Sequence, residues 1–260
     1  ARGRTYRTDP HRSGRMRLAK RAAVAAWGVM RRDLAIQRSY GSVALVGLAS
    51  GLLGIVIYRF VGELVDDSGE HLLERGYFAF VVAGLVLYQM TAAVAASVAN
   101  GFGRDAAEGT LEIARAAGSP AGALLAGAGA SAFLLSFLQA SLYAAVALLW
   151  LAPETPTYVP NLPAALLCTA LSVLAMLPLG IFGAAVWLVT RRAGFVVGPC
   201  LGAMPLLGGV YFPATLLPSP LAAVAEWVPL RIGADALREA LFAGASLVAL
   251  RVELLQLVGI

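Results

Sequence analysis

One charged stretch, Arg104-Asp-Ala-Ala-Glu-Gly-Thr-Leu-Glu-Ile-Ala-Arg115, separates two long apolar runs of the chain. Gly118, Ser119 and Pro120 follow it, and this combination is typical of a helix end. Asp105 with Glu108 three residues later resembles the capping box that starts a helix, although the strict pattern begins with Ser or Thr. The stretch therefore predicts a short helix over residues 104–117, which lies between two membrane spans.

The predicted helix has two different sides. Leu111 and Ala114 fall on one side, while the other side carries charges through neighbours three and four residues apart, namely Glu108, Glu112 and Arg115. A charged helix between two spans can receive a push from a soluble partner. An ordinary solvated loop helix remains the alternative.

The composition indicates a membrane protein. Of the 260 residues, 59% are hydrophobic and 13% are charged, against roughly 25% charged in soluble domains. Uncharged apolar runs of about 20 residues recur, which predicts a polytopic helical protein. The net charge of +5 does not indicate nucleic-acid binding, because much of the arginine lies in residues 1–38, where it is a topology signal.

Several site chemistries are excluded within the 260 residues. Lys20 is the only lysine, so the nucleotide-binding pattern GxxxxGK[ST] does not occur. With only His11 and His71, neither a His-rich metal site nor an HExxH hydrolase is expected. Cys168 and Cys200 lie in apolar runs and behave as small hydrophobes. No metal ligands, catalytic residues or bound cofactors are predicted.

The N-terminal region divides in two. Residues 1–19 form an arginine-rich tail that we expect to be disordered. Residues 20–38 combine Trp27 and other apolar residues at helical spacing with a cationic side, which predicts an interfacial helix on the inner leaflet. A signal peptide over Ala22–Met30 is the competing interpretation. The Arg31-Arg32-Asp33 that follows, with no small-residue cleavage site, argues against it.

Five membrane spans are predicted, and a sixth begins near Leu250 and is incomplete at Ile260. The first span carries Gly47 and Gly51 at the GxxxG spacing of close helix contacts. Residues 218–245 contain apolar segments that are too short to cross, and we expect re-entrant or interfacial helices there. The five spans are 41–60, 77–98, 121–151, 164–190 and 194–217.

The charges of the loops predict the orientation. The N-terminal segment, the 104–115 stretch and Arg191–Arg192 hold most of the positive charge, whereas loops 63–75 and 152–163 hold one arginine and several acids. The chain should therefore be a multi-pass protein of the cell membrane with its N-terminus in the cytoplasm.

The order of these motifs resembles the type-2 ABC exporter permeases over residues 27–260. Arg-Arg-Asp-Leu (31–34) resembles the elbow helix of that family, and Glu-Gly-Thr-Leu-Glu (108–112) with Gly-Ser-Pro (118–120) resembles its cytoplasmic coupling helix. The remaining matches are similar to its fifth span and outer re-entrant helices: Gly209-Val-Tyr-Phe-Pro213, Leu-Leu-Pro (216–218), Pro229-Leu230 and Ala-Leu-Arg-Glu-Ala-Leu (236–241).

The resemblance implies an all-α bundle of six spans, with residues 20–260 as a permease domain. Two permease subunits, as a homodimer or a similar heterodimer, would form the pore. Two separate ATPase subunits, which bind ATP and Mg²⁺, would dock on the coupling helices. The chain itself would be neither an enzyme nor a nucleotide-binding protein.

Three groups of site residues follow from the resemblance. The ATPase-coupling residues are Asp105, Glu108, Thr110, Leu111, Glu112 and Arg115. The elbow residues are Trp27, Arg31, Arg32, Asp33 and Leu34. The outer-gate residues are Tyr211, Phe212, Pro213, Glu226, Arg238 and Glu239. Within the outer gate we expect Glu226 to pair with the Arg238–Glu239 region, with solvated charges at headgroup level as the alternative.

An amphipathic or lipid-linked substrate (a drug, lipid or glycan) fits the uncharged spans better than an ion or a free sugar. The aromatic residues of these spans line the pathway, or they belong to the core or to the interfacial belt, with equal support: Tyr58, Tyr88, Phe133, Phe137 and Tyr143. A secondary transporter would carry ionisable residues at mid-membrane, and the first four spans have only the terminal Arg59. Ser131 in Gly-Ala-Ser-Ala (129–132) lacks an intramembrane histidine to activate it. A purely structural subunit stays open.

Overall fold

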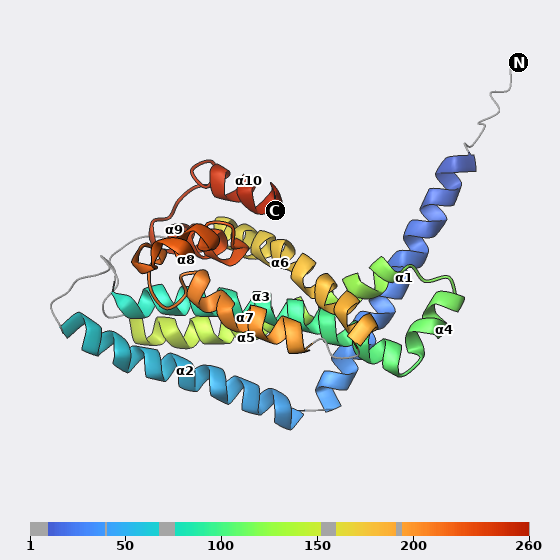
Figure 1. The fold of residues 1–260 in the computed structure, drawn as a ribbon, viewed down its shortest axis with the longest axis horizontal. Coiled ribbons are helices and arrows are strands. Elements are labelled where there is room, and N and C mark those ends of the chain that lie inside the picture. The colour runs from blue at the N-terminus through green and yellow to red at the C-terminus, as the bar shows by residue number, and fades with distance from the viewer. Residues whose placement is uncertain (1–9, 40, 68–75, 152–159, 191–193, 260) are drawn as a thin grey trace, which may run out of the picture.

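The computed structural model describes residues 10–39, 41–67, 76–151, 160–190 and 194–259, and the regular elements in these ranges are all helices (Figure 1). Four of them are long and apolar enough to cross a membrane. They are α2 (Gly41–Asp67), α3 (Tyr77–Ala107), α5 (Ala121–Leu151) and α6 (Leu162–Thr190). The prediction of an all-α multi-pass membrane protein is confirmed.

Helix α3 is the centre of the bundle. In its most apolar window 67% of the residues are buried, against 39% in α5 and in α6 and 11% in α2. Small residues allow this close packing. A Cβ added to Gly180 of α6 would lie 2.8 Å from the carbonyl oxygen of Ala95 in α3. The other helices therefore dock on α3, and α2 is the least covered.

The glycines predicted for close contact in α2 meet α5. The ring of Tyr143 lies where a side chain on Gly51 would be, and its hydroxyl donates a hydrogen bond to the carbonyl of Gly47 at 3.3 Å. Elsewhere α2 exposes large apolar side chains, including Leu53 and Phe60, which suits contact with lipid or with another protein chain.

The last third of the chain is a series of short helices. It contains α7 (Gly194–Leu207), the 3₁₀ turn η1 (Ala214–Leu216), α8 (Ser219–Ala225), α9 (Pro229–Phe242) and α10 (Arg251–Gly259). The predicted fifth span over 194–217 thus ends ten residues early as a helix. Gly209 adopts a φ of 62°, which a glycine accepts without strain, and Pro213 cannot donate a backbone hydrogen bond.

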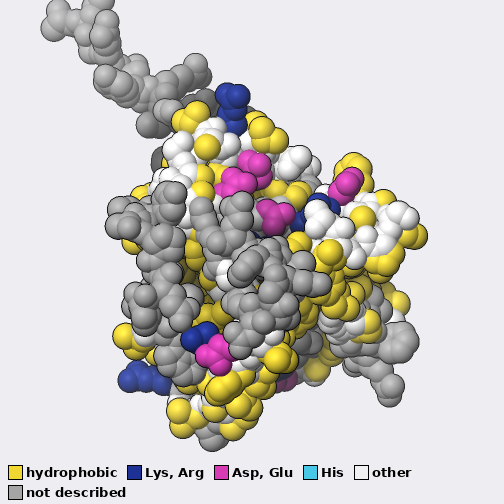
Figure 2. All heavy atoms as spheres, turned by 90° about the vertical axis from the view of Figure 1, so that its left-hand side faces the viewer, with side chains coloured by type: hydrophobic (Ala, Val, Ile, Leu, Met, Phe, Trp, Pro, Cys, Tyr) yellow, Lys and Arg dark blue, Asp and Glu magenta, His cyan; other side chains and the backbone are white. Residues whose placement is uncertain are grey.

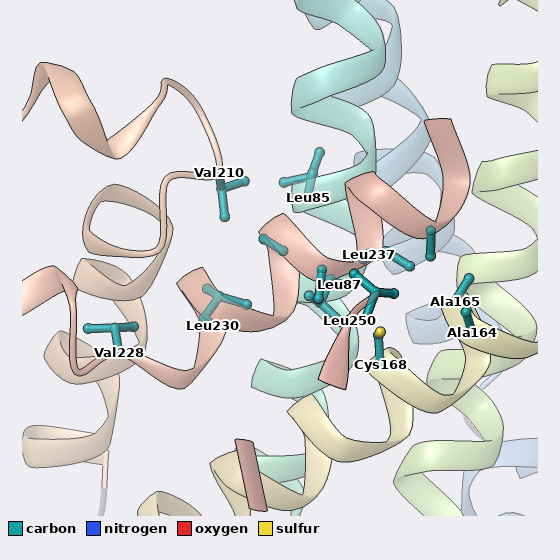
Figure 3. Packing of buried hydrophobic residues seen from close by; sticks show 13 residues of the cluster. Leu85, Leu87, Ala164, Ala165, Cys168, Val210, Val228, Leu230, Leu237 and Leu250 are labelled. Atoms are coloured by element: carbon teal, nitrogen blue, oxygen red, sulfur yellow. The ribbon is translucent and has the colours of Figure 1, made fainter. Parts of the chain in front are cut away.

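A large apolar cluster attaches α9 to the spans (Figure 3). Leu230 and Leu237 of α9 pack with Leu85 and Leu87 of α3. Cys168 of α6 and Leu250, in the turn just before α10, complete the cluster. At about 1.5 Å per residue, α9 is roughly 21 Å long, too short to cross a hydrocarbon core of about 30 Å.

The N-terminal helix α1 (Pro10–Ser39) is longer than predicted. Residues 10–19, which the sequence assigns to a disordered tail, are helical, since proline suits a first turn and Arg, Met, Leu and Ala favour helix. Residues 1–9, the loop segments 68–75 and 152–159, and the Arg191–Arg192 turn lie outside the described residues.

The two ends of the bundle carry different short helices. Helix α4 (Thr110–Ala116) lies beside α1 at one end, while α8, α9 and α10 lie together toward the other end (Figure 1). This separation places the charged stretch and the short C-terminal helices toward opposite ends of the four long helices.

Candidate functional site

Helix α4 begins after a sharp break in the chain. Helix α3 continues to Ala107, Gly109 adopts a φ of 70°, and α4 starts at Thr110 without a side-chain cap. The predicted capping box is therefore wrong, because Asp105 lies inside the last turn of α3. The break falls at Gly109 since a left-handed conformation favours glycine. The Thr110 hydroxyl reinforces the turn by donating to the carbonyl of Asp105 at 3.0 Å.

The two predicted sides of this helix are confirmed. Leu111 is only 5% exposed and packs in a small apolar cluster with Val29 of α1 and Leu124 of α5. Glu108, Glu112 and Arg115 are exposed.

The exposed side also carries an apolar residue that the sequence analysis missed. Ile113 of α4 is 71% exposed, although it stands between two exposed charges of that helix. The one signal in the sequence that indicates the exposure of Ile113 is its position on the outward side of the helix, four residues after Gly109. With Ile113 exposed between charged residues, the outward side of α4 has the apolar centre and polar rim that are found in protein interfaces.

The exit from α4 is as tightly ordered as its entry. Gly118 adopts a φ of 78°, and the backbone N–H groups of Gly118 and Ser119 donate to the carbonyls of Arg115 and Ala114 at 2.9 and 3.0 Å. Paired bonds of this kind satisfy the last carbonyls of a helix. Helix α4 is therefore joined to α3 and α5 by short hydrogen-bonded turns.

Three charged residues at the base of α4 form a cluster that we call the arginine clamp: Arg32, Asp33 and Asp105. The guanidinium of Arg32 donates to both carboxylate oxygens of Asp105, at 2.8 and 3.2 Å. Its Nε and Nη2 donate to one oxygen of Asp33, at 3.0 and 2.9 Å. The pair with Asp105, in which two nitrogens meet two oxygens, is the geometry at which arginine binds carboxylate best.

The clamp connects three helices. Arg32 and Asp33 belong to α1, and Asp105 lies in the last turn of α3. The hydroxyl of Ser131 in α5 donates to the second oxygen of Asp33 at 3.3 Å. Partial burial lowers the pKa of Arg32, but the carboxylates of Asp105 and Asp33 outweigh it and hold that pKa above its ordinary value. Arg32 thus stays charged, and Ser131, which resembled a nucleophile in sequence, orients an acid of the clamp.

The other elbow residues do not take part in the clamp. Trp27 is 58% exposed and Arg31 is exposed, while Leu34 is half-buried. An exposed tryptophan beside arginines suits the boundary between headgroups and acyl chains. The sequence predicted these residues as one interfacial group, whereas the structure divides them into a clamp and an outward-facing set.

At the opposite end of the bundle, Arg238 of α9 is buried and ties three helices together. It donates to the carbonyls of Phe80 in α3 and Gly209 after α7, at 3.1 and 2.9 Å. Its guanidinium also lies 3.5 Å from the centre of the Phe80 ring. The expected pair with Glu226 is replaced by one with Asp235, one turn earlier on the same helix, at 3.2 Å.

Within the described residues, the remaining predicted outer-gate residues form no side-chain hydrogen bond or ion pair with Arg238. Glu226 and Glu239 are exposed, and Tyr211, Phe212 and Pro213 are half-buried. The Tyr211 ring stacks on Tyr58 of α2 with 5.7 Å between ring centres. Acidic side chains gather in the upper half of this end of the molecule, with hydrophobic ones around them (Figure 2).

Among the described residues, no group of three or more His, Cys, Asp or Glu side chains is arranged to hold a metal ion. The model of the family described as ABC-2 type transporter matches residues 26–242, which include α4, the arginine clamp and Arg238. No curated protein matches the chain.

Proposed function

Since this chain belongs to the ABC-2 type transporter family and is the transmembrane subunit of an ABC transporter, we propose that α4 is the helix on which its ATPase subunit docks. The observation that carries the proposal is the exposed side of α4. Glu112, Ile113 and Arg115 are exposed on α4, and Glu108 is exposed just before that helix. Leu111 anchors the opposite side to α1 and α5.

The arginine clamp gives this docking helix a mechanical role. Its ion pairs join α1 and α3 immediately before the Gly109 break, and the Gly118 turn leads directly into α5. A push on α4 by an ATPase would therefore move α3, α5 and α1 together. In this proposal α1 is the interfacial elbow helix, and α3, the most buried helix, carries the movement into the bundle.

The finer features of the transporter belong to the same proposal. Two copies form the pathway, ATP is hydrolysed by the separate subunit, and an amphipathic or lipid-linked substrate moves outward. The end with α4 faces the cytoplasm, and the end with α8 and α9 faces outward. A six-span arrangement needs α7 and α10 as spans, in addition to the four long helices. The exposed apolar surface of α2 supports contact with lipid or with the second copy.

Reversing the charges of α4 tests the proposal. The double variant Glu108→Arg with Glu112→Arg changes only exposed side chains, so the chain should fold and insert as before. Loss of a docked charge pair costs about 2–5 kcal/mol when it is buried in the interface. ATPase stimulation and transport should fall together while the amount of permease stays constant.

The matched control is Ser219→Arg, an exposed position on α8 at the opposite end of the bundle. It should leave ATPase stimulation unchanged. A charge-reversed α4 that still binds the ATPase and transports at the normal rate would contradict the proposal, and α4 would then be a solvated connection.

A further inference from the structure

A cavity of about 230 Å³ lies within the bundle between α2, α3 and α5, and we call it the amide pocket. Its polar lining comes from Gln89 of α3 and from Ser136, Gln139 and Tyr143 of α5, with Gly47 of α2 at its edge. Among the residues that line it there is no charged side chain. Two glutamines at one site are notable because the same spans are otherwise almost entirely apolar.

Helical spacing brings these polar groups to one place. Gln89 and Ala93 are four residues apart on α3, and Ser136, Gln139 and Tyr143 are three and four apart on α5. Residues at these intervals share a face of a helix. Helices α3 and α5 therefore turn matching faces toward each other, and each of them contributes one amide to the pocket.

The two amides have no partner in the folded chain. Within the described residues, neither the Gln89 nor the Gln139 side chain makes a hydrogen bond. Ser136 and Tyr143 use their hydroxyl protons on the carbonyls of Ala132 and Gly47, so their oxygens remain free as acceptors. Polar groups at membrane depth that lack partners are costly unless water or a ligand supplies them.

We propose that the amide pocket binds the uncharged, hydroxyl- or amide-bearing head of an amphipathic substrate. Two amides offer both donors and acceptors, and two hydroxyl oxygens add acceptors, which matches a sugar-like or amide head. A charged head would lose its hydration without meeting an opposite charge. The pocket is smaller than the roughly 300–1,000 Å³ of sites for drug-sized ligands, so it holds a head and excludes the tail.

The hydrocarbon tail of such a substrate has a place beside the pocket. Leu45 and Val46, next to Gly47 on α2, are 66% and 69% exposed. On α5, Leu138, next to Gln139, is 61% exposed. Exposed apolar side chains thus stand next to two of the residues that line the pocket, and a tail can contact them. The inference rests on the proposed function as a transporter, because it gives the class of substrate which that transporter moves.

A direct binding experiment tests the inference without any ATPase. The purified chain in phosphatidylcholine nanodiscs is labelled with a photoreactive dodecyl glucoside, and the labelled peptides are mapped. Labelling should saturate and fall on α3 and α5. Gln89→Leu and Gln139→Leu should each weaken the apparent Kd about tenfold, as expected when one hydrogen-bonding group is lost. Gln256→Leu, the same change at an exposed position on α10, should leave it unchanged.

Three competitors distinguish recognition of the head group from contact with the hydrocarbon tail. Dodecyl maltoside should compete, whereas dodecyltrimethylammonium and dodecane at equal concentration should not. Thermal unfolding of each variant verifies that it is folded, and Gln139→Asn, which keeps an amide, should bind more tightly than Gln139→Leu. Unsaturable labelling, equal competition by dodecane, or unchanged affinity in a variant that combines Gln89→Leu with Gln139→Leu would each overturn the inference.

The two proposals can fail separately. Saturable, glutamine-dependent labelling of a chain that stimulates no ATPase would leave the pocket in place and remove the proposed function. Transport that depends on Glu108 and Glu112, in a chain that shows no such labelling, would remove only the pocket.

Discussion

Replacing Arg32 with alanine should destabilise the chain more than replacing Asp105 does, although the two side chains form the same ion pair. Arg32 serves two acids, so its loss leaves both Asp33 and Asp105 without a cation. The side chains of these acids are only 12% and 13% exposed. Loss of Asp105 leaves Arg32 paired with Asp33.

The burial of the clamp sets the size of the effect. Exposed ion pairs contribute about 0–1 kcal/mol, and removal of one partner of a buried pair costs about 3–5 kcal/mol. The Arg32 side chain is 36% exposed, so the clamp lies between these limits. We expect Arg32→Ala to lower the free energy of unfolding by about 2–3 kcal/mol and Asp105→Ala to lower it by about 1 kcal/mol.

The free energy of unfolding is measured in mixed micelles by titration with dodecyl sulfate. It is measured for Arg32→Ala, for Asp105→Ala and for the variant that carries both changes. The double-mutant cycle should give a coupling of about 1 kcal/mol. Arg31→Ala removes an exposed cation from the same helix and should stay within about 0.5 kcal/mol of the parent protein. A cost for Asp105→Ala that equals that of Arg32→Ala, or additivity in the cycle, would refute the clamp.

Two further predictions concern the outer end and the orientation. Arg238→Met should lower the thermal unfolding temperature more than Arg231→Met, because a buried carbonyl left without its donor costs about 1–3 kcal/mol; equal shifts would mean that Arg238 does not hold α9 in place. In a variant without native cysteines, a cysteine at Ser219 should react with an impermeant reagent added outside intact cells and one at Ala107 should not, and the reverse pattern would invert the proposed topology.

The long helices could be predicted from the sequence because each depends on local composition. Apolar runs such as 77–98 and 164–190 are long enough to cross a membrane, and α3 and α6 contain them. The sides of α4 were predicted for the same reason, because helical spacing alone separates Leu111 from Glu108 and Glu112. A pattern that follows the helical period can be predicted from the sequence without knowledge of which other helix the segment contacts.

The pairings of charges could not be predicted in the same way. Arg32 and Asp105 are 73 residues apart, and Arg238 reaches a carbonyl of Phe80 across 158 residues. Such contacts depend on how whole helices dock, which no local pattern records. Asp105 was therefore assigned to a capping box, and Glu226 was expected to be the partner of Arg238.

Site-specific cross-linking at Ile113 tests the central claim most directly, namely that α4 is in contact with an ATPase. A photoreactive phenylalanine derivative at this exposed position, in the transporter purified from its native cell, should form a covalent link to an ATP-hydrolysing subunit. The same derivative at Leu221 of α8, which is 46% exposed at the opposite end of the bundle, should form none. A transporter that is active but yields no ATPase cross-link from position 113, or yields it equally from position 221, would contradict the account.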